Sequence, residues 1–184
     1  MGEEHPFSVL DFDKSTGQIL ITFKVFGKFT TKLAGTKTGE ILLADGPYGN
    51  FTNETYDLGN SPRVFIAGGI GITPFVRHIL DKNAPETHLF YANQTSQTAS
   101  YRSTLKNSLG RRYVDIFSRQ EVSHNNKNIE SGHINKNMLE KYINQPQKYN
   151  YFICGPKEMI NTTESSLKLL GVPSSQIHSE KFEF

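Results

Sequence analysis

The chain has 184 residues, and its formal net charge of +2 comes from 20 Lys and Arg against 18 Asp and Glu. This length fits one large domain or two small ones, and so small a charge gives no reason to expect nucleic acid or an anionic membrane surface as a partner. No apolar run approaches the roughly 20 residues of a membrane-spanning helix. Met1–His5 has neither the basic nor the apolar stretch of a signal peptide.

Cys154 is the single cysteine of the sequence. One cysteine excludes an internal disulfide and a protein-bound iron–sulfur cluster with four cysteine ligands, and it suits the reducing conditions of the cytoplasm. We therefore expect a cytoplasmic protein, or one at the cytoplasmic face of a membrane if the chain is cut from a larger protein. The six histidines show no metal-ligand spacing, so we expect no metal site.

The first 60 residues have the pattern of β structure. Gln18–Val25 alternates, is rich in β-branched and aromatic residues and follows a Ser-Thr-Gly turn, which predicts a strand. Glu40–Ala44 predicts a second strand that ends at Asp45–Gly49, and Phe7–Phe12 is a candidate for a third. We expect no amphipathic helix before Asn60.

From Ser61 onward the pattern changes to alternating strands and helices, which is typical of a parallel sheet. The expected strands are Arg63–Ala67, His88–Ala92, Tyr113–Ser118, Tyr149–Cys154 and Ile177–Phe184. The expected helices are Pro74–Leu80, Thr98–Leu109, one that starts after Asn135 and one that starts after Pro156 and ends before Gly171.

These elements predict an α/β fold with a five-stranded, parallel, Rossmann-like domain at residues 61–184, preceded by a β part at residues 1–60. The polar stretch Glu121–Ser131 is expected to be an exposed loop. Because ligands of open parallel sheets bind beyond the carboxyl ends of the strands, the residues at those ends are the first candidates for a site.

Two glycine-containing turns stand at such ends. Arg63–Ala67 runs directly into Gly-Gly-Ile-Gly-Ile-Thr-Pro at residues 68–74, and the fourth strand ends in Cys154-Gly155-Pro156. Glycines let backbone N–H groups approach a pyrophosphate, and a helix N-terminus beyond them favours negative charge. Two other interpretations stay open: a strand-to-helix turn without a ligand, and a Cys154 that packs as a small apolar side chain.

The β part carries three short motifs of its own. His5–Ser8 and Gly46–Gly49 would, taken singly, be a proline-containing strand start and a turn. Gly27–Thr31 offers backbone N–H groups, a cation and hydroxyls that suit a phosphate, although a loop with a solvated lysine explains it better in isolation.

Taken together, the motifs resemble the ferredoxin–NADP⁺ reductase superfamily, because they occur in its sequence order over nearly the whole chain. The first motif is most similar to that of the ferric-reductase and NADPH-oxidase-like branch. Each motif is weak alone, but six in the right order are specific. They are HPFS at 5–8, GKFTTKL at 27–33, DGPYG at 45–49, GGIGITP at 68–74, FICGPKEM at 152–159 and SEKFEF at 179–184.

The resemblance implies a flavin-binding β-barrel before the nucleotide domain, with FAD in the cleft between them and NADPH as the expected hydride donor, NADH being the less expected one. It also implies that hydride passes from NAD(P)H to the flavin, which passes electrons onward to a ferric or haem, ferredoxin-like or quinone acceptor. The cofactors supply this chemistry, and the protein positions them.

The resemblance further implies roles for particular residues. Phe7 would flank the flavin ring and Ser8 would lie near its N5, and His5 and Pro6 would also bind the cofactor. Gly27, Lys28, Phe29, Thr30 and Thr31 would meet the flavin pyrophosphate. Gly69, Gly71, Thr73 and Pro74 would cradle the NAD(P)H pyrophosphate. Cys154, Gly155 and Pro156 would form the nicotinamide pocket, Glu180 would join a proton path near N5, and Phe182 would cover the flavin face.

Two departures from the family pattern matter. Where this chain has His5-Pro6-Phe7-Ser8, many members have Arg-x-Tyr-Ser. A histidine cannot reproduce the bidentate pairing of that arginine's guanidinium with a flavin phosphate. The family's barrel has roughly six strands, and those that precede the first motif are absent here, so residues 1–60 predict a partial, N-terminally truncated barrel. We expect such a half to bind flavin poorly and either to self-associate through its open edge or to rearrange.

The choice of nucleotide depends on the end of the second parallel strand. No carboxylate that would bind a ribose diol stands there, and Tyr101-Arg102 follow shortly after. We therefore expect NADPH to be preferred to NADH, with Ser96 and Arg102 near the 2′-phosphate, although Gln94 stands where some relatives carry a basic residue.

Two rival functions remain. One is a ferric-chelate or quinone reductase whose haem-bearing membrane domain lies on a missing N-terminal segment. The other is a non-catalytic module that binds NAD(P)H or docks a partner.

Overall fold

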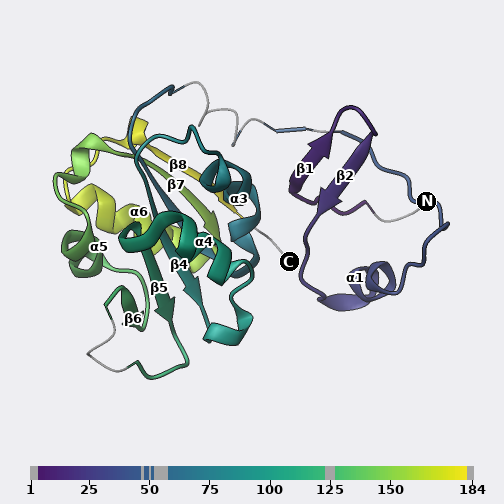
Figure 1. Cartoon of the computed structure of the whole chain (residues 1–184). Helices are drawn as coiled ribbons and strands as arrows, with labels where there is room; N and C mark the ends of the chain where they lie inside the picture. The colour runs from purple at the N-terminus through teal and green to yellow at the C-terminus, as the bar shows by residue number, and fades with distance from the viewer. Residues whose placement is uncertain (1–3, 47, 50, 52–57, 123–126, 182–184) are drawn as a thin grey trace.

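The computed structural model describes residues 4–46, 48, 49, 51, 58–122 and 127–181. Its main feature is a six-stranded sheet in which every neighbouring pair is parallel. Figure 1 shows this sheet with helices on both faces and a smaller part beside it that contains β1, β2 and α1. In spatial order the strands are β6 Ile129–Ser131, β5 Tyr113–Phe117, β4 Thr87–Asn93, β3 Arg63–Gly68, β7 Asn150–Gly155 and β8 Ile177–Lys181.

Strand β3 shows why the sequence builds this sheet. Every residue of β3 is buried, and because side chains alternate between faces, Val64 and Ile66 pack into one core while Phe65 and Ala67 pack into the other. Both faces are therefore covered, which requires the continuous apolar run seen in the sequence. Each fully buried large side chain of this kind stabilises the fold by roughly 1.5–3 kcal/mol.

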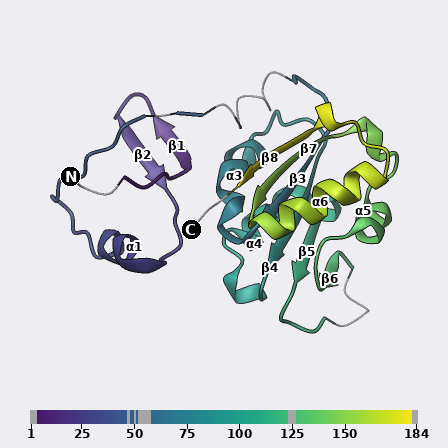
Figure 2. The ribbon, with the colours of Figure 1, turned by 180° about the vertical axis from the view of Figure 1, so that it is seen from behind.

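Two pairs of helices cover the two faces, as Figures 1 and 2 show from opposite sides. Residues of α3 and α4 pack with Phe65, and residues of α5 and α6 pack with Val64. The Asn135 side chain caps α5 by accepting a hydrogen bond from the Met138 N–H at 3.0 Å. The helices are α3 Thr73–Leu80, α4 Arg102–Leu109, α5 Lys136–Tyr142 and α6 Lys157–Leu169.

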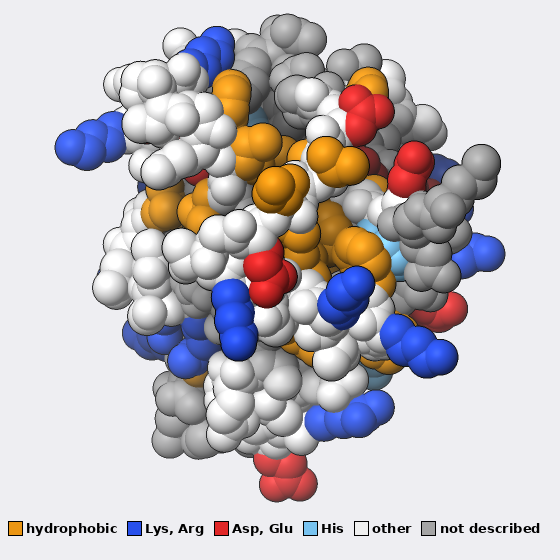
Figure 3. Space-filling view, turned by 90° about the vertical axis from the view of Figure 1, so that its right-hand side faces the viewer, with side chains coloured by type: hydrophobic (Ala, Val, Ile, Leu, Met, Phe, Trp, Pro, Cys, Tyr) orange, Lys and Arg blue, Asp and Glu red, His pale blue; other side chains and the backbone are white. Residues whose placement is uncertain are grey.

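The N-terminal part consists of an antiparallel hairpin, β1 Val9–Asp13 with β2 Gln18–Ile21, and the helix α1 Gly27–Ala34. The hairpin contacts the sheet part through Leu10, which is 8% exposed and belongs to the core beneath α3. Many of its other apolar side chains are exposed. Figure 3 views this side of the molecule and shows hydrophobic side chains gathered near its centre with Lys and Arg around them. The exposed apolar residues of β1 and β2 are Val9, Phe12, Ile19 and Leu20.

The prediction of an α/β fold with a parallel sheet is confirmed, and so is an antiparallel β part before it. The sheet has six strands instead of the expected five, because β6 lies at the end of the stretch expected to be a loop. β6 has three residues and pairs with Asp115, Ile116 and Phe117. So short and polar a segment carries no strand pattern of its own, and its pairing with β5 is what makes it a strand.

Two predictions in the first 60 residues are wrong. Glu40–Ala44 forms no strand: the structure assigns it no regular element, and Ile41 and Leu43 are 89% and 99% exposed. A strand needs a neighbour for its hydrogen bonds, and within the described residues this segment has none. Conversely, Gly27–Ala34 is a helix where none was expected. In addition, β2 ends at Ile21 rather than Val25.

The backbone of Tyr101 is unusual. Tyr101 directly precedes α4, at its N-cap position, with a φ of 59°, in the left-handed region. An aromatic residue there costs about 1–3 kcal/mol and persists only when the surrounding structure imposes it. Its neighbour Arg102 is held by the fully buried Asp115, and the Tyr101 carbonyl accepts the Leu105 N–H at 3.0 Å. These contacts on its C-terminal side help to hold Tyr101 in this strained form.

Candidate functional site

The two glycine-containing turns meet at the carboxyl edge of the sheet. β3 and β7 are adjacent, and Ala67 pairs with Cys154 just before both turns begin. A Cβ on Gly71 would lie 2.3 Å from the Cys154 carbonyl oxygen, and a Cβ on Gly68 would lie 2.7 Å from the Cδ of Pro156. Packing between the turns therefore requires glycine at 68 and 71, whatever ligand is bound.

Gly69 is different from these two glycines. Its φ is +54°, which favours glycine, and a Cβ there would meet nothing within 4 Å. The Gly69 carbonyl accepts a hydrogen bond from the Tyr91 hydroxyl at 3.1 Å, which fixes the turn to β4. Gly69 thus presents open backbone at the edge, and that is the space an approaching pyrophosphate needs. Gly155, with a φ of +154°, is closely packed, since its Cβ would lie 2.8 Å from the Cε of Met159.

Thr73 and Pro74 start α3 directly after this turn, at the same edge. The Thr73 hydroxyl donates to the Ile70 carbonyl oxygen at 3.0 Å, and Thr73 is 1% exposed. Its side chain therefore closes the short 3₁₀ turn Gly69–Ile72. What these positions offer a phosphate is the dipole at the N-terminal end of an eight-residue helix, because the Thr73 N–H already donates to the Ile70 carbonyl and Pro74 has no N–H.

Cys154 and Glu180 are in register on β7 and β8. Cys154 is fully buried and packs in the core beneath α3. This burial, and to a smaller extent the Glu180 charge, raises the pKa of the Cys154 thiol. Glu180 is exposed, yet partial desolvation by its neighbours raises the pKa of its carboxyl. The structure therefore brings together Cys154, expected beside the nicotinamide, and Glu180, expected on a proton path near the flavin N5, while Phe182 lies outside the described residues.

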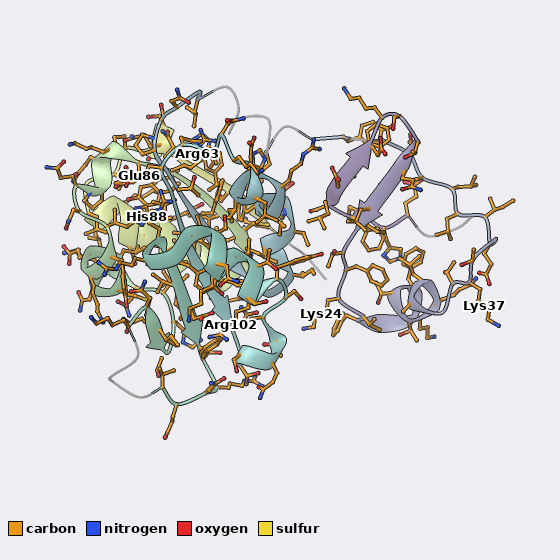
Figure 4. All side chains as sticks on the ribbon, in the orientation of Figure 1. Lys24, Lys37, Arg63, Glu86, His88 and Arg102 are labelled. Atoms are coloured by element: carbon orange, nitrogen blue, oxygen red, sulfur yellow. The ribbon has the colours of Figure 1, made fainter. Side chains whose placement is uncertain are left out.

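Arg102 is engaged within the protein. Its Nε and Nη2 donate to the two oxygens of Asp115 at 2.8–3.1 Å, and the Tyr113 hydroxyl donates to the same carboxylate at 2.7 Å. Asp115 is completely buried, and its hydrogen bonds raise the pKa of Arg102. Figure 4 labels Arg102 beside the sheet. The pairing explains Arg102 without a ligand, so its place at a 2′-phosphate stays a prediction.

Ser96 lies in the short turn Ser96–Thr98 that follows β4, and its N–H donates to Oε1 of Gln120 at 2.8 Å. Beside it lies Arg119, which the sequence motifs did not indicate. The N–H of Arg119 donates to the Gln94 carbonyl at 2.9 Å, and Arg119 is exposed. The sequence signal for Arg119 was a cation two residues beyond the end of β5. The prediction of a 2′-phosphate site considered only the end of the second strand, β4, and so missed it.

The motifs of the N-terminal part also come together. The ring of His5 stacks on that of Phe29, with centroids 3.9 Å apart, and Phe7 contacts Phe29 and Phe23 at 6.2 and 5.7 Å. Pro6 is exposed and Ser8 half-buried beside them. Thus residues 5–8 and 27–31, which were both expected at a flavin, share one aromatic cluster.

Helix α1 positions the second of these motifs. Gly27 starts it with a φ of +80°, and Lys28 is exposed in its first turn, where no acidic residue lies. The hydroxyl of Thr30 donates to the Phe26 carbonyl at 2.7 Å and that of Thr31 to the Gly27 carbonyl at 2.8 Å. The threonines therefore stabilise the helix start, and the N-terminus with Lys28 offers the positive potential that a phosphate needs.

One known protein family matches most of the part of the chain that forms the six-stranded sheet. The model of the oxidoreductase NAD-binding domain family matches residues 65–165, which is more than half of the chain. The chain belongs to this family, within the ferredoxin–NADP⁺ reductase superfamily.

Its relatives include the reductase component of propane 2-monooxygenase from Rhodococcus jostii, 29% identical over 98% of this chain and 52% of that protein. A component of the 1,2-phenylacetyl-CoA epoxidase from Escherichia coli is 32% identical over 79% of this chain and 44% of that protein. The chain thus spans about half the length of these curated relatives.

Solved structures agree on the fold. The cytochrome b5 reductase domain of Ulva prolifera nitrate reductase superposes with a TM-score of 0.74 at 21% identity, over 96% of this chain and 76% of that one. A ferredoxin NADP⁺ reductase from Neisseria gonorrhoeae with bound FAD and NADP gives 0.73 at 18% identity, over 95% and 78%. Within the described residues, no helix is both long and apolar enough to cross a bilayer.

Proposed function

We propose that this chain is the nucleotide-binding part of a flavin-dependent NAD(P)H oxidoreductase, together with part of its flavin-binding half. The proposal rests on the surroundings of Gly69. On either side of it, Gly68 and Gly71 pack tightly against the end of β7, whereas the space next to Gly69 is open and lies beside the start of α3. In this proposal residues 61–184 hold NAD(P)H and residues 1–60 contribute to the FAD site.

When bound, NAD(P)H supplies the hydride and FAD accepts it. The chain's own residues bind and orient. The backbone of Gly69 and the N-terminus of α3 hold the nucleotide pyrophosphate, and Gly155 and Pro156 shape the space at the end of β7. Cys154, fully buried, fixes the shape of this edge by packing. Glu180, whose raised pKa brings its carboxyl closer to neutral pH, can hold a proton at the same edge.

At the other part, the stacked rings of His5, Phe7 and Phe29 suit an aromatic ligand, because ring faces stack on flat π-systems. The N-terminus of α1 with Lys28 suits its pyrophosphate. Without the guanidinium that a bidentate contact needs, this phosphate contact is weaker, and weak flavin retention therefore stays part of the proposal.

The names of the relatives support electron transfer as the function of this chain. Their names include the electron transfer component of anthranilate 1,2-dioxygenase, a flavohemoprotein, an NADH-cytochrome b5 reductase and a component of a Na⁺-translocating NADH-quinone reductase. For this chain we propose an acceptor of the same kinds, a haem, ferredoxin-like or quinone group in another domain or protein. A membrane haem domain and self-association through the hairpin edge are further parts of the proposal.

Gly69→Ala tests the nucleotide site. The added methyl meets no protein atom, so its cost to the fold is the strain of a positive φ, about 1–2 kcal/mol. It would, however, occupy the space of the pyrophosphate, and we expect the Kd for NAD(P)H, measured by quenching of nucleotide fluorescence, to rise at least ~10-fold.

Gly110→Ala is the matched control, because Gly110 has a φ of +56°, an open Cβ direction and a position at the far end of α4. It should keep its affinity for NAD(P)H, although it too places an alanine at a positive φ. Equal affinities in the two variants would refute a pyrophosphate site at Gly69.

The alternative is a module that binds the nucleotide without catalysis. Unchanged flavin in the presence of bound NAD(P)H, with FAD supplied in excess, would favour that module over the oxidoreductase.

A further inference from the structure

A side-chain hydrogen bond joins the N-terminal part of the chain, close to its aromatic cluster, to the sheet part. The hydroxyls of Thr22 and Tyr101 lie 2.5 Å apart and are partly buried. Thr22 directly follows β2 and precedes Phe23, whose ring contacts Phe7 in the aromatic cluster. Tyr101 ends the segment that leads from β4 into α4. The bond therefore links the flavin-side cluster to the nucleotide side through one residue on each.

Tyr101 is held rigidly on the nucleotide side. Its ring packs against the core beneath α3, and Arg102 is fixed by two-pronged hydrogen bonds to the fully buried Asp115. Its left-handed backbone, which a tyrosine adopts only under constraint, is maintained by these contacts. The Tyr101 hydroxyl is thus a fixed point from which the position of Thr22 is set.

Two further contacts between the parts are less directional. Arg77 and Asp11 form an ion pair at 3.4 Å, but their side chains are 61% and 60% exposed, and such surface pairs contribute little. Leu10 is buried beneath α3, yet apolar burial does not define an orientation. The Thr22–Tyr101 bond does define one, because a hydrogen bond weakens steeply when its angle or distance changes.

We infer that Thr22 and Tyr101 are positioning residues: their hydrogen bond holds the hairpin and its aromatic cluster at the separation from the nucleotide edge that hydride transfer needs. This inference rests on the proposed function. Small errors in the placement of reacting groups reduce the rate steeply while binding is maintained. The pair therefore acts on the rate of flavin reduction more than on nucleotide affinity.

Tyr101→Phe and Thr22→Val each remove one hydroxyl and keep the shape of the side chain. With FAD in excess, each should lower the rate of flavin reduction at saturating nucleotide by about 5- to 10-fold, and the double variant should be no slower than the singles, because both remove the same bond. The Kd for the nucleotide should change by less than about 2-fold. In the ligand-free chain, amide hydrogen exchange of β2 should be faster in both variants.

Tyr142→Phe is the control. It removes a tyrosine hydroxyl that donates to Glu130 from α5, on the opposite face of the sheet, and should leave all three measurements unchanged. A normal reduction rate in Tyr101→Phe and Thr22→Val would overturn the inference, and so would unchanged exchange in β2. Failure of the wild-type chain to bind nucleotide or to reduce flavin would instead refute the proposed function, and the exchange measurement would still decide whether the bond holds the hairpin.

Discussion

Gly71 and the carbonyl of Cys154 lie against each other so closely that no side chain fits between them: a Cβ on residue 71 would be 2.3 Å from that oxygen and 2.7 Å from its carbon. The neighbour is backbone of a central strand, which cannot rotate away as a side chain can. The turn after β3 and the end of β7 are therefore a single packed unit.

Gly71→Ala should accordingly destabilise the protein. Forcing the turn away from β7 costs typically about 1–3 kcal/mol, as for other overpacked sites, and more if the strand cannot shift. We expect a lower urea midpoint with an unchanged slope of the unfolding curve. Gly69→Ala in the same turn adds no overlap with protein atoms and should lose only the strain of its positive φ, about 1–2 kcal/mol. Equal losses in the two variants would contradict the close packing of residue 71.

The buried thiol of Cys154 should be unreactive in the folded protein. Burial raises the pKa of the thiol, so little thiolate is present near neutral pH, and no exposed surface admits a reagent. We expect Ellman's reagent at a mildly alkaline pH to react at least ~100-fold more slowly with the native chain than with the chain in urea. Rapid native labelling would show that this edge opens readily.

Cys154→Ala should also affect hydride transfer. If the side chain shapes the nicotinamide pocket, the variant should reduce flavin more slowly while its Kd for NAD(P)H changes less, because positional effects appear mainly in the transition state. Stopped-flow reduction of the FAD-loaded protein measures both. An unchanged rate would make Cys154 a packing residue only.

The stability of the fold should depend on pH through His78. Desolvation, and then the nearby Arg63 and Arg77, lower the pKa of this buried imidazole from 6.5 to about 4, while Asp81 opposes the shift. Between these two values the unfolded chain takes up a proton that the folded chain does not, so stability falls as pH falls through this window.

The expected loss is roughly 3 kcal/mol between about pH 7 and about pH 4. Urea unfolding of the wild type and of His78→Gln at several pH values measures it, and the variant should lack this component. Parallel pH profiles for the two proteins would show that His78 titrates normally.

The preference for NADPH over NADH can be tested at Arg119. This exposed cation lies beside Gln94, and its neighbour Gln120 accepts the Ser96 N–H. The other arginine expected at the 2′-phosphate, Arg102, is paired with Asp115. If the 2′-phosphate binds there, Arg119→Ala should raise the Kd for NADPH about 10-fold and that for NADH much less.

Arg111→Ala, which removes an exposed arginine after the far end of α4, is the control and should change neither affinity. Equal affinities of the wild-type chain for the two nucleotides would contradict the preference itself.

The sequence predicted those features that reside in a local pattern. The strands of the sheet are continuous apolar runs because both faces are covered, and the glycine turns follow directly from them. Helix α1 could not be predicted in the same way: it has eight residues, and Phe29 gains its packing from His5, which is distant in sequence.

Among the site residues, the same limit applies to Arg102. Its partner Asp115 is 13 positions away on another element, so the sequence shows a free cation where the fold forms a buried pair. The open face of Gly69 and the tight packing of Gly71 are likewise indistinguishable in the motif and become distinct only through β7.

The exposed segment between α1 and the sheet has a practical consequence. Leu43 is 99% exposed and lies in no regular element, so the bond that follows it is accessible to a protease that cleaves after large apolar residues. A cut there leaves the hairpin and α1 on one peptide and all six sheet strands on the other. Non-covalent contacts such as those of Leu10 and Thr22 would then hold the two peptides together, and their co-elution or separation would report directly on how strongly the flavin side adheres to the nucleotide side.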